Sequence, residues 1–95
     1  MNSRFSLAVH VLCLLASASE ERLTSEYIAT SIGTNAVVIR RLLAKLRRFG
    51  LVTSKSAGGG GWMLAHPAGD ITLDQVRRAM APAATGPAPR LANYL

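Results

Sequence analysis

The hydrophobic and polar positions of the chain repeat at helical spacing over four segments, which are separated by short polar stretches. The first segment, Phe5 to Ala16, is apolar around most of its circumference. Its polar neighbours share one narrow stripe, which consists of Ser3, Ser6, His10, Cys13 and Ser17. A helix with so wide an apolar surface must be enclosed by other elements. We therefore expect a central core helix over this segment.

The same segment also has features of a secretory signal, because Arg4 precedes it and Ala16-Ser17-Ala18 follows it as an A-x-A cleavage pattern. A single basic residue is little for such a signal, and His10 interrupts the apolar run. The run is also shorter than the roughly 20 residues that cross a bilayer. We favour a core helix over an exported segment, and hence a cytoplasmic protein that does not bind membranes.

A short second helix is expected over Ser25 to Ser31. The hydroxyl of Thr24 can cap its first turn, and Gly33 can end it by adopting the left-handed conformation. The helix would bury Ile28 and Ile32. Another helical pattern starts directly after this glycine.

That third helix is expected over Ala36 to Phe49, and either Thr34 or Asn35 can cap it. Its apolar residues recur every three or four positions and form a stripe that we expect to be buried, namely Ile39, Leu42, Leu43, Leu46 and Phe49. The remaining residues face outward or lie on the flanks: Val37, Arg40, Arg41, Ala44, Lys45, Arg47 and Arg48. Two helices joined by a short turn with glycine form the helix-turn-helix pattern.

After Gly50, two short apolar segments flank a glycine-rich stretch, which predicts a β-hairpin, or wing. Its strands would be Leu51 to Ser54 and Trp62 to Ala65, with a tip over Ala57 to Gly61. We interpret Trp62 as the anchor that holds the hairpin on the core. A glycine run also occurs in phosphate-binding loops, but neither a lysine-serine/threonine pair nor a helix follows it here.

A fourth helix would begin at Thr72, a good capping residue, and bury Leu73 and Val76. From residue 82 the composition turns to Ala, Pro, Gly and Thr, which indicates a linker or tail. We therefore predict a mainly α-helical fold with a small β-hairpin, a winged helix-turn-helix, over residues 1–81. A Pro/Ala-rich tail over residues 82–95 would follow it.

Basic residues gather in the middle of the chain. Between Tyr27 and Gly69 the chain has six of them and no Asp or Glu, a number equal to its whole formal net charge of +6. They are Arg40, Arg41, Lys45, Arg47, Arg48 and Lys55. Solvated helix surfaces normally mix both signs, so a basic helix without compensating acid indicates a phosphate-rich partner. We expect that partner to be double-stranded DNA.

The candidate DNA-binding residues are Thr34, Asn35, Val37, Arg40, Arg41, Lys45, Arg47, Arg48, Lys55, Ser56, Gly58 and Gly59. Arg40 and Arg41 suit bases or phosphates, and the later basic residues suit phosphates, which orient a protein without reading sequence. In the first turn, Asn35 can bond adenine and an apolar side chain can pack on a thymine methyl group. Glycines in the wing would let backbone N–H groups approach the DNA backbone.

Cys13 is the single cysteine, which excludes an internal disulfide and a multi-cysteine metal site. His10 lies one turn earlier and, if protonated, could lower the thiol pKa, but we favour a buried, inert cysteine. Tyr27 and Phe49 are likewise interpreted as packing residues. No nucleophile, base and orienting group are grouped by spacing, so we expect neither an enzyme nor a metal or other cofactor. A thiol-based redox regulator using Cys13 and a protein-interaction module without DNA binding are the alternatives.

Several segments resemble the bacterial Rrf-two family of winged helix-turn-helix transcription regulators. They are residues 27–43, 46–52 and 59–65, followed by Ile71-Thr72-Leu73. The similarity as a whole extends over nearly all of residues 1–80. It implies that the third helix enters the major groove and that the wing touches the neighbouring backbone or minor groove. It also implies a homodimer on a palindromic operator, most often acting as a repressor.

Three departures from the family pattern change these expectations. Cluster-binding relatives have three cysteines after the fourth helix, whereas residues 81–95 contain none, so we expect no iron–sulfur cluster. Relatives continue into a long helix that pairs two subunits, where this chain is Pro-rich, so the first helix could supply part of a dimer interface. Many relatives have Pro in place of Ala36 and a basic residue in place of Ser56, so we expect weaker wing contacts.

Overall fold

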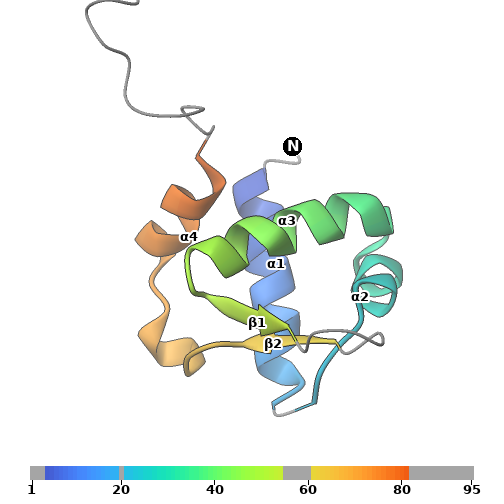
Figure 1. Ribbon diagram of the computed structural model, residues 1–95, viewed down its shortest axis with the longest axis horizontal. Helices are drawn as coiled ribbons and strands as arrows, with labels where there is room; N and C mark the ends of the chain where they lie inside the picture. Colours follow the sequence, from blue (N-terminus) through green and yellow to red (C-terminus); the bar gives the residue numbers. More distant parts are fainter. Residues whose placement is uncertain (1–3, 20, 55–60, 82–95) are drawn as a thin grey trace, which may run out of the picture.

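The computed structural model describes residues 4–19, 21–54 and 61–81. In this part of the chain, four α-helices pack together and a two-stranded antiparallel sheet lies against α1 and α3 (Figure 1). The elements are α1 (Arg4–Ser17), α2 (Ser25–Ile32), α3 (Ala36–Arg48), β1 (Val52–Ser54), β2 (Trp62–Leu64), the 3-10 helix η1 (Ala68–Asp70) and α4 (Leu73–Met80). The predicted mainly α-helical architecture with a small hairpin is therefore confirmed.

The first helix lies in the centre of the molecule, as its pattern predicted. It contacts α2, α4, β2 and η1, and α3 crosses in front of it in Figure 1. Its buried residues are Ala8, Val11, Leu12 and Leu15, whereas Ser6, His10, Cys13 and Ser17 of the polar stripe are exposed. Burial of a leucine or valine side chain contributes about 1.5–3 kcal/mol, so α1 supplies a large part of the core energy. Within the described residues, no helix combines the length and apolarity needed to span a bilayer.

Local side-chain bonds set the helix boundaries where the sequence placed them. The Thr24 hydroxyl accepts a 3.0 Å hydrogen bond from the backbone N–H of Tyr27, and Gly33 ends α2 with φ +84°. Asn35 caps α3 by accepting a 2.7 Å bond from the N–H of Val37. Such caps satisfy backbone groups that have no partner within the helix. Thr72 does the same for α4 in a capping box with Gln75.

Three apolar residues expected to pack, namely Tyr27, Phe49 and Leu73, are instead exposed. Phe49 is 52% exposed because α3 ends at Arg48, and the chain then turns toward Gly50 with φ +74°. Tyr27 is 55% exposed, because α2 buries its face through Ser25, Ile28 and Ala29. Ile28 is thus buried as predicted, whereas Ile32 is only partly buried.

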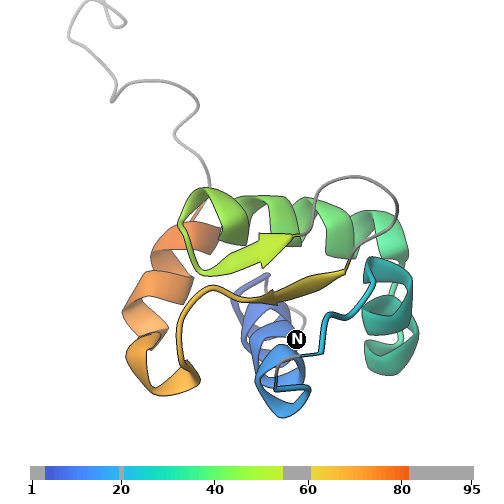
Figure 2. The ribbon, with the colours of Figure 1, turned by 60° about the horizontal axis from the view of Figure 1, so that its bottom comes forward.

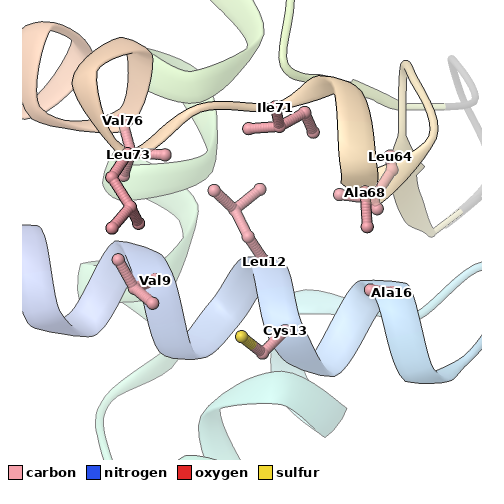
Figure 3. Close-up of a pocket in the computed structure, with 9 residues that line it drawn as sticks. All are labelled: Val9, Leu12, Cys13, Ala16, Leu64, Ala68, Ile71, Leu73 and Val76. Carbon is pink, nitrogen blue, oxygen red and sulfur yellow. The ribbon is translucent and has the colours of Figure 1, made fainter.

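Leu73 is 64% exposed, although we expected it to be buried, whereas Val76 is buried as predicted. Leu73 is the first residue of α4 and lies at an apolar hollow of about 130 Å³ between α1 and the η1–α4 segment. Figure 3 shows Leu73 reaching toward Val9 and Leu12 pointing toward the same segment. The residue thus borders the groove without entering the core.

The hairpin is tied to the segment before α2, which the sequence pattern did not indicate. Its strands pair with Val52 opposite Leu64 and Ser54 opposite Trp62. Leu23 adds a third backbone pairing. Its N–H donates to the Trp62 carbonyl at 2.9 Å, and its carbonyl oxygen accepts from the Trp62 N–H at 2.7 Å. Trp62 also packs against the core, so its interpretation as an anchor is confirmed.

Candidate nucleic-acid interface

The outer surface of α3 is built by the same periodicity that buries its inner stripe. Ile39, Leu42, Leu43 and Leu46 are buried, as predicted. At 100° per residue, the row opposite this stripe consists of Val37, Arg41, Ala44 and Arg48. Val37 is 44% exposed, and both arginines of the row are exposed. In Figure 2, α3 lies along one side of the molecule, with the hairpin between it and α1.

The N-terminal turn of α3 combines a polar cap with exposed aliphatic side chains. The Asn35 Oδ1 atom is used to cap the helix, and a bidentate contact with adenine would need that oxygen as well as the amide N–H groups. Because a carbonyl oxygen has two lone pairs, cap and base contact are compatible only if Oδ1 is shared. Val37 and Val38 are 44% and 43% exposed and offer apolar surface beside this turn.

Arg40 lies on the flank of α3 that faces α2, and it is paired with an acid. Its Nη1 atom is 2.8 Å from Oε2 of Glu26, whose other oxygen accepts a 3.3 Å bond from the Ser25 hydroxyl. A hydrogen bond from its own backbone N–H lowers the pKa of Glu26, and Ser25 and Arg40 lower it further. The expected absence of compensating acid on this face was therefore wrong at Arg40. Glu26 lies one position before the acid-free stretch, and only the packing of α2 on α3 reveals the pair.

Arg47 lies on the same flank and joins α3 to the hairpin. Its Nη1 atom donates a 3.0 Å hydrogen bond to the Ser54 hydroxyl, and its guanidinium carbon is 5.5 Å from the centre of the Trp62 ring. A cation–π contact at an exposed site contributes roughly 0.5–1 kcal/mol. The exposed arginine thus fixes the position of the hairpin beside the C-terminal half of α3.

Much of the positive charge that has no ion-pair partner in the described residues is on α3. Among the described residues, Arg41, Lys45 and Arg48 make no ion pair, whereas Arg77 and Arg78 of α4 both pair with Asp74, at 2.7 and 2.9 Å. Lys45 is half-buried on the flank toward α1 and α4. Lys55, Ser56, Gly58 and Gly59 lie outside the described residues, so their predicted contacts are untested.

Cys13 is exposed, so its interpretation as a buried thiol was wrong. The side chain lies on the exposed polar stripe of α1 at the rim of the hollow in Figure 3. The exposure of Cys13 does not test the redox hypothesis, which stays a prediction. Within the described ranges, no group of three or more His, Cys, Asp or Glu side chains could hold a metal ion.

Comparison with known proteins identifies a family. Residues 1–89 match the Rrf2 family, described as iron-dependent transcriptional regulators. The proposed HTH-type transcriptional regulator YwnA of Bacillus subtilis is 39% identical over 80 residues, which make up 84% of this chain and 58% of YwnA. The chain therefore spans less than two thirds of the length of this relative.

Solved structures share the fold over almost the whole chain. CymR, the global cysteine regulator of B. subtilis, superposes with a TM-score of 0.77 at 20% identity, over 98% of this chain and 76% of CymR. T. potens IscR gives 0.76 at 23% identity, over 99% and 69% of the two chains. A protein proposed to bind DNA gives 0.74 at 34% identity, over 97% and 74%. The predicted winged helix-turn-helix is thereby confirmed.

The iron dependence in the family description does not fit the donor groups of this chain. The sequence contains one cysteine, and the structure places it alone on an exposed helix face. A cluster of the Cys-ligated kind needs several thiolates.

Proposed function

Because this chain belongs to the Rrf2 family of transcriptional regulators, which are not enzymes, we propose that it acts by binding specific sequences of double-stranded DNA. The observation that carries the proposal is the outer face of α3. Arg41 and Arg48 on this face and Lys45 on its flank have no ion-pair partner among the described residues, while the opposite face is fully used by the core. A cationic helix held in this way is complementary to a polyanion.

In the proposed complex, the N-terminal half of α3 enters the major groove, which admits one α-helix. Val37 packs on thymine methyl groups, Asn35 bonds adenine, and Thr34 lies beside them in the turn before the helix. Arg40 and Arg41 contact bases or phosphates. The residues assigned to phosphates or to the neighbouring backbone are Lys45, Arg47, Arg48, Lys55, Ser56, Gly58 and Gly59.

The ion pair with Glu26 favours one of the two DNA contacts proposed for Arg40. A guanidinium bonded at 2.8 Å to a carboxylate has lost part of its attraction for phosphate. The same bond restricts its rotamers and holds it beside the first two turns of α3. We therefore assign Arg40 to a base edge and leave the phosphates to the basic residues without an acid partner.

We further propose that the protein is a cytoplasmic homodimer that binds a palindromic operator and acts as a repressor without an iron–sulfur cluster. Two-fold symmetric regulators bind half-sites related by the same symmetry, which is the support for a palindrome. The family resemblance supports repression, and the single cysteine supports the absence of a cluster.

The test begins with selection of bound duplexes from random DNA, followed by affinity measurements over a range of salt concentrations. Each neutralised phosphate should contribute about −0.9 to the slope of log affinity against log salt. Arg48→Gln should make the slope shallower by about this amount. The matched control is Arg77→Gln, which removes an arginine of α4 that pairs with Asp74, and it should leave the slope unchanged.

Affinity that does not depend on salt, or the failure of every duplex to bind, would contradict the proposal. The mass of the complex gives the number of chains per duplex, and an odd number would exclude the symmetric dimer. The selected sequences show whether the operator is a palindrome.

A further inference from the structure

A second basic cluster lies on the flank of α3 that faces α1 and α4. A hollow of about 160 Å³ is lined there by Arg4 of α1 and by Arg41 and Lys45 of α3. Its apolar lining consists of Leu7, Val38, Leu42 and Met80, and no Asp or Glu contributes to it. Figure 1 shows why these elements meet, because the first turn of α1 emerges between α3 and α4. Arg4 was not among the DNA-binding residues expected from the sequence.

Folding alone does not account for three cations around one hollow. Arg41 and Lys45 are four positions apart on a helix, where like charges destabilise the folded state, and Arg4 adds a third positive charge. Three other arginines of the described chain have acid partners, namely Arg40 with Glu26 and both Arg77 and Arg78 with Asp74, whereas no acid lines this hollow. The three positive charges repel one another in the free protein, and an anion that binds between them would remove this repulsion.

The position of the hollow identifies which anion fits. It adjoins the outward row of α3 at Arg41, on the side opposite the Arg40–Glu26 pair and the hairpin. An α-helix is about 10–12 Å wide and the major groove about 12 Å, so a helix in the groove lies close to both backbones. Arginine forks match phosphate oxygens in geometry as well as charge. The apolar lining suits the stems of long basic side chains, which leave their charged ends in water.

We propose that this hollow binds a backbone phosphate on the wall of the major groove opposite the hairpin, and that Arg4 is a DNA-contacting residue. The inference rests on the proposed function, because it extends the same DNA interface from α3 to α1. Residues 82–95 follow Met80 closely in the sequence, but they contain no Asp or Glu and so do not supply a matching carboxylate side chain.

The test compares Arg4→Gln with Arg78→Gln in the full chain, on a duplex obtained by selection. Both variants lose one positive charge, but Arg78 lies on α4 outside the hollow and pairs with Asp74. Arg4→Gln should make the salt slope shallower by about 0.9, the value for one phosphate, and should weaken binding to all sequences alike. Arg4→Lys should restore the slope. An unchanged slope for Arg4→Gln, or equal changes in the two glutamine variants, would overturn the proposal.

A second experiment locates the phosphate. Duplexes that carry one neutral methylphosphonate at successive backbone positions should bind the protein more weakly when the replaced phosphate is the one in the hollow. That position should have a smaller effect on Arg4→Gln than on the wild-type protein, because the contribution of Arg4 to the interaction is already lost. Additive losses at every position would exclude the contact.

Failure of this inference is distinguishable from failure of the proposed function. If the protein binds duplexes with a steep salt dependence that Arg4→Gln leaves intact, only the contact at the hollow is excluded. If no duplex binds, both proposals fail. A measurement without DNA adds a check: Arg4→Gln should raise the melting temperature at low salt, and the increase should disappear at high salt. A melting temperature unchanged or lowered at low salt would contradict the charge repulsion on which the inference depends.

Discussion

Gly61 has a structural role that its neighbourhood in the sequence conceals. It ends a run of glycines that reads as a flexible hairpin tip, yet it is buried. A Cβ atom placed on it would lie 2.7 Å from the backbone carbonyl carbon and oxygen of Leu23. Glycine is therefore what allows Leu23 to pair with Trp62. Sequence pattern could not predict this close approach, because Leu23 is far away along the chain.

Gly61→Ala should destabilise the protein by about 1–3 kcal/mol, since a backbone segment must move to accept the new methyl group. Urea unfolding of the variant measures the loss. The matched control is Gly69→Ala, where a Cβ atom would meet nothing within 4 Å, and its effect should stay below about 1 kcal/mol. Equal stabilities of the two variants would show that the Leu23–Trp62 pairing adjusts without cost.

At the scale of the elements, local signals were sufficient to predict most of the structure. Caps at Thr24 and Thr72 and the glycine at position 33 act within a few residues, so helix boundaries followed from sequence alone. The two faces of α3 followed from its periodicity in the same way. Phe49 fits this periodicity, but α3 ends one residue before it. The exposure of Phe49 depends on the direction in which the following turn leads the chain away from the core.

The candidate site was less predictable, because its charges are set by contacts between elements. The Arg40–Glu26 pair depends on the packing of α2 on α3, and the bond from Arg47 to Ser54 depends on where the hairpin lies. The pattern identified the basic side chains of α3. It could not show which of them are bonded within the protein and which remain available to a ligand.

Asn35 allows the cap of α3 to be separated from DNA recognition. Asn35→Ala should lower the stability by about 1 kcal/mol, because the N–H of Val37 loses its side-chain partner. Asn35→Ser retains a capping oxygen and should keep the stability within about 0.5 kcal/mol. If the amide bonds adenine, the serine variant should lose about 1–3 kcal/mol of discrimination at one base pair.

Thermal unfolding and selection from random DNA measure these two effects separately. If the base preference of Asn35→Ser is unchanged, the Asn35 side chain acts only as a helix cap and is removed from the proposed DNA contacts. A stability loss as large in Asn35→Ser as in Asn35→Ala would show that the serine does not cap.

At the scale of the whole molecule, charge affects folding and binding in opposite ways. The chain has 11 Lys and Arg residues against 5 Asp and Glu residues. This excess draws the protein toward a polyanion and also makes its compact state repel itself. Added salt should therefore weaken DNA binding while it reduces the repulsion within the protein. The few carboxylates that pair with arginines counteract that repulsion.

The free energy of unfolding should consequently decrease at acid pH. Arg77, through its hydrogen bond, and then Arg78, through its charge, lower the pKa of Asp74, and the hydrogen bond from its own backbone N–H is the largest cause of the lowered pKa of Glu26. Unfolding returns both carboxyls to ordinary pKa values near 4, so the unfolded chain binds protons more readily. This contribution to stability is complete above about pH 5 and is lost as the pH falls through the lowered pKa values of the folded protein.

Melting temperatures measured from pH 6 to pH 2.5 test this sign. The wild-type protein should lose stability progressively below about pH 4.5, and the double variant Glu26→Gln, Asp74→Asn should start lower and lose less over the same range. The control is Glu21→Gln, which removes a carboxylate without an ion pair in the described chain and should keep the wild-type slope. An equally steep acid loss in the double variant would mean that other groups cause the acid sensitivity. In that case the Glu26–Arg40 pair would not contribute measurably to the pH dependence of stability, and only its effect on DNA binding would remain to be measured.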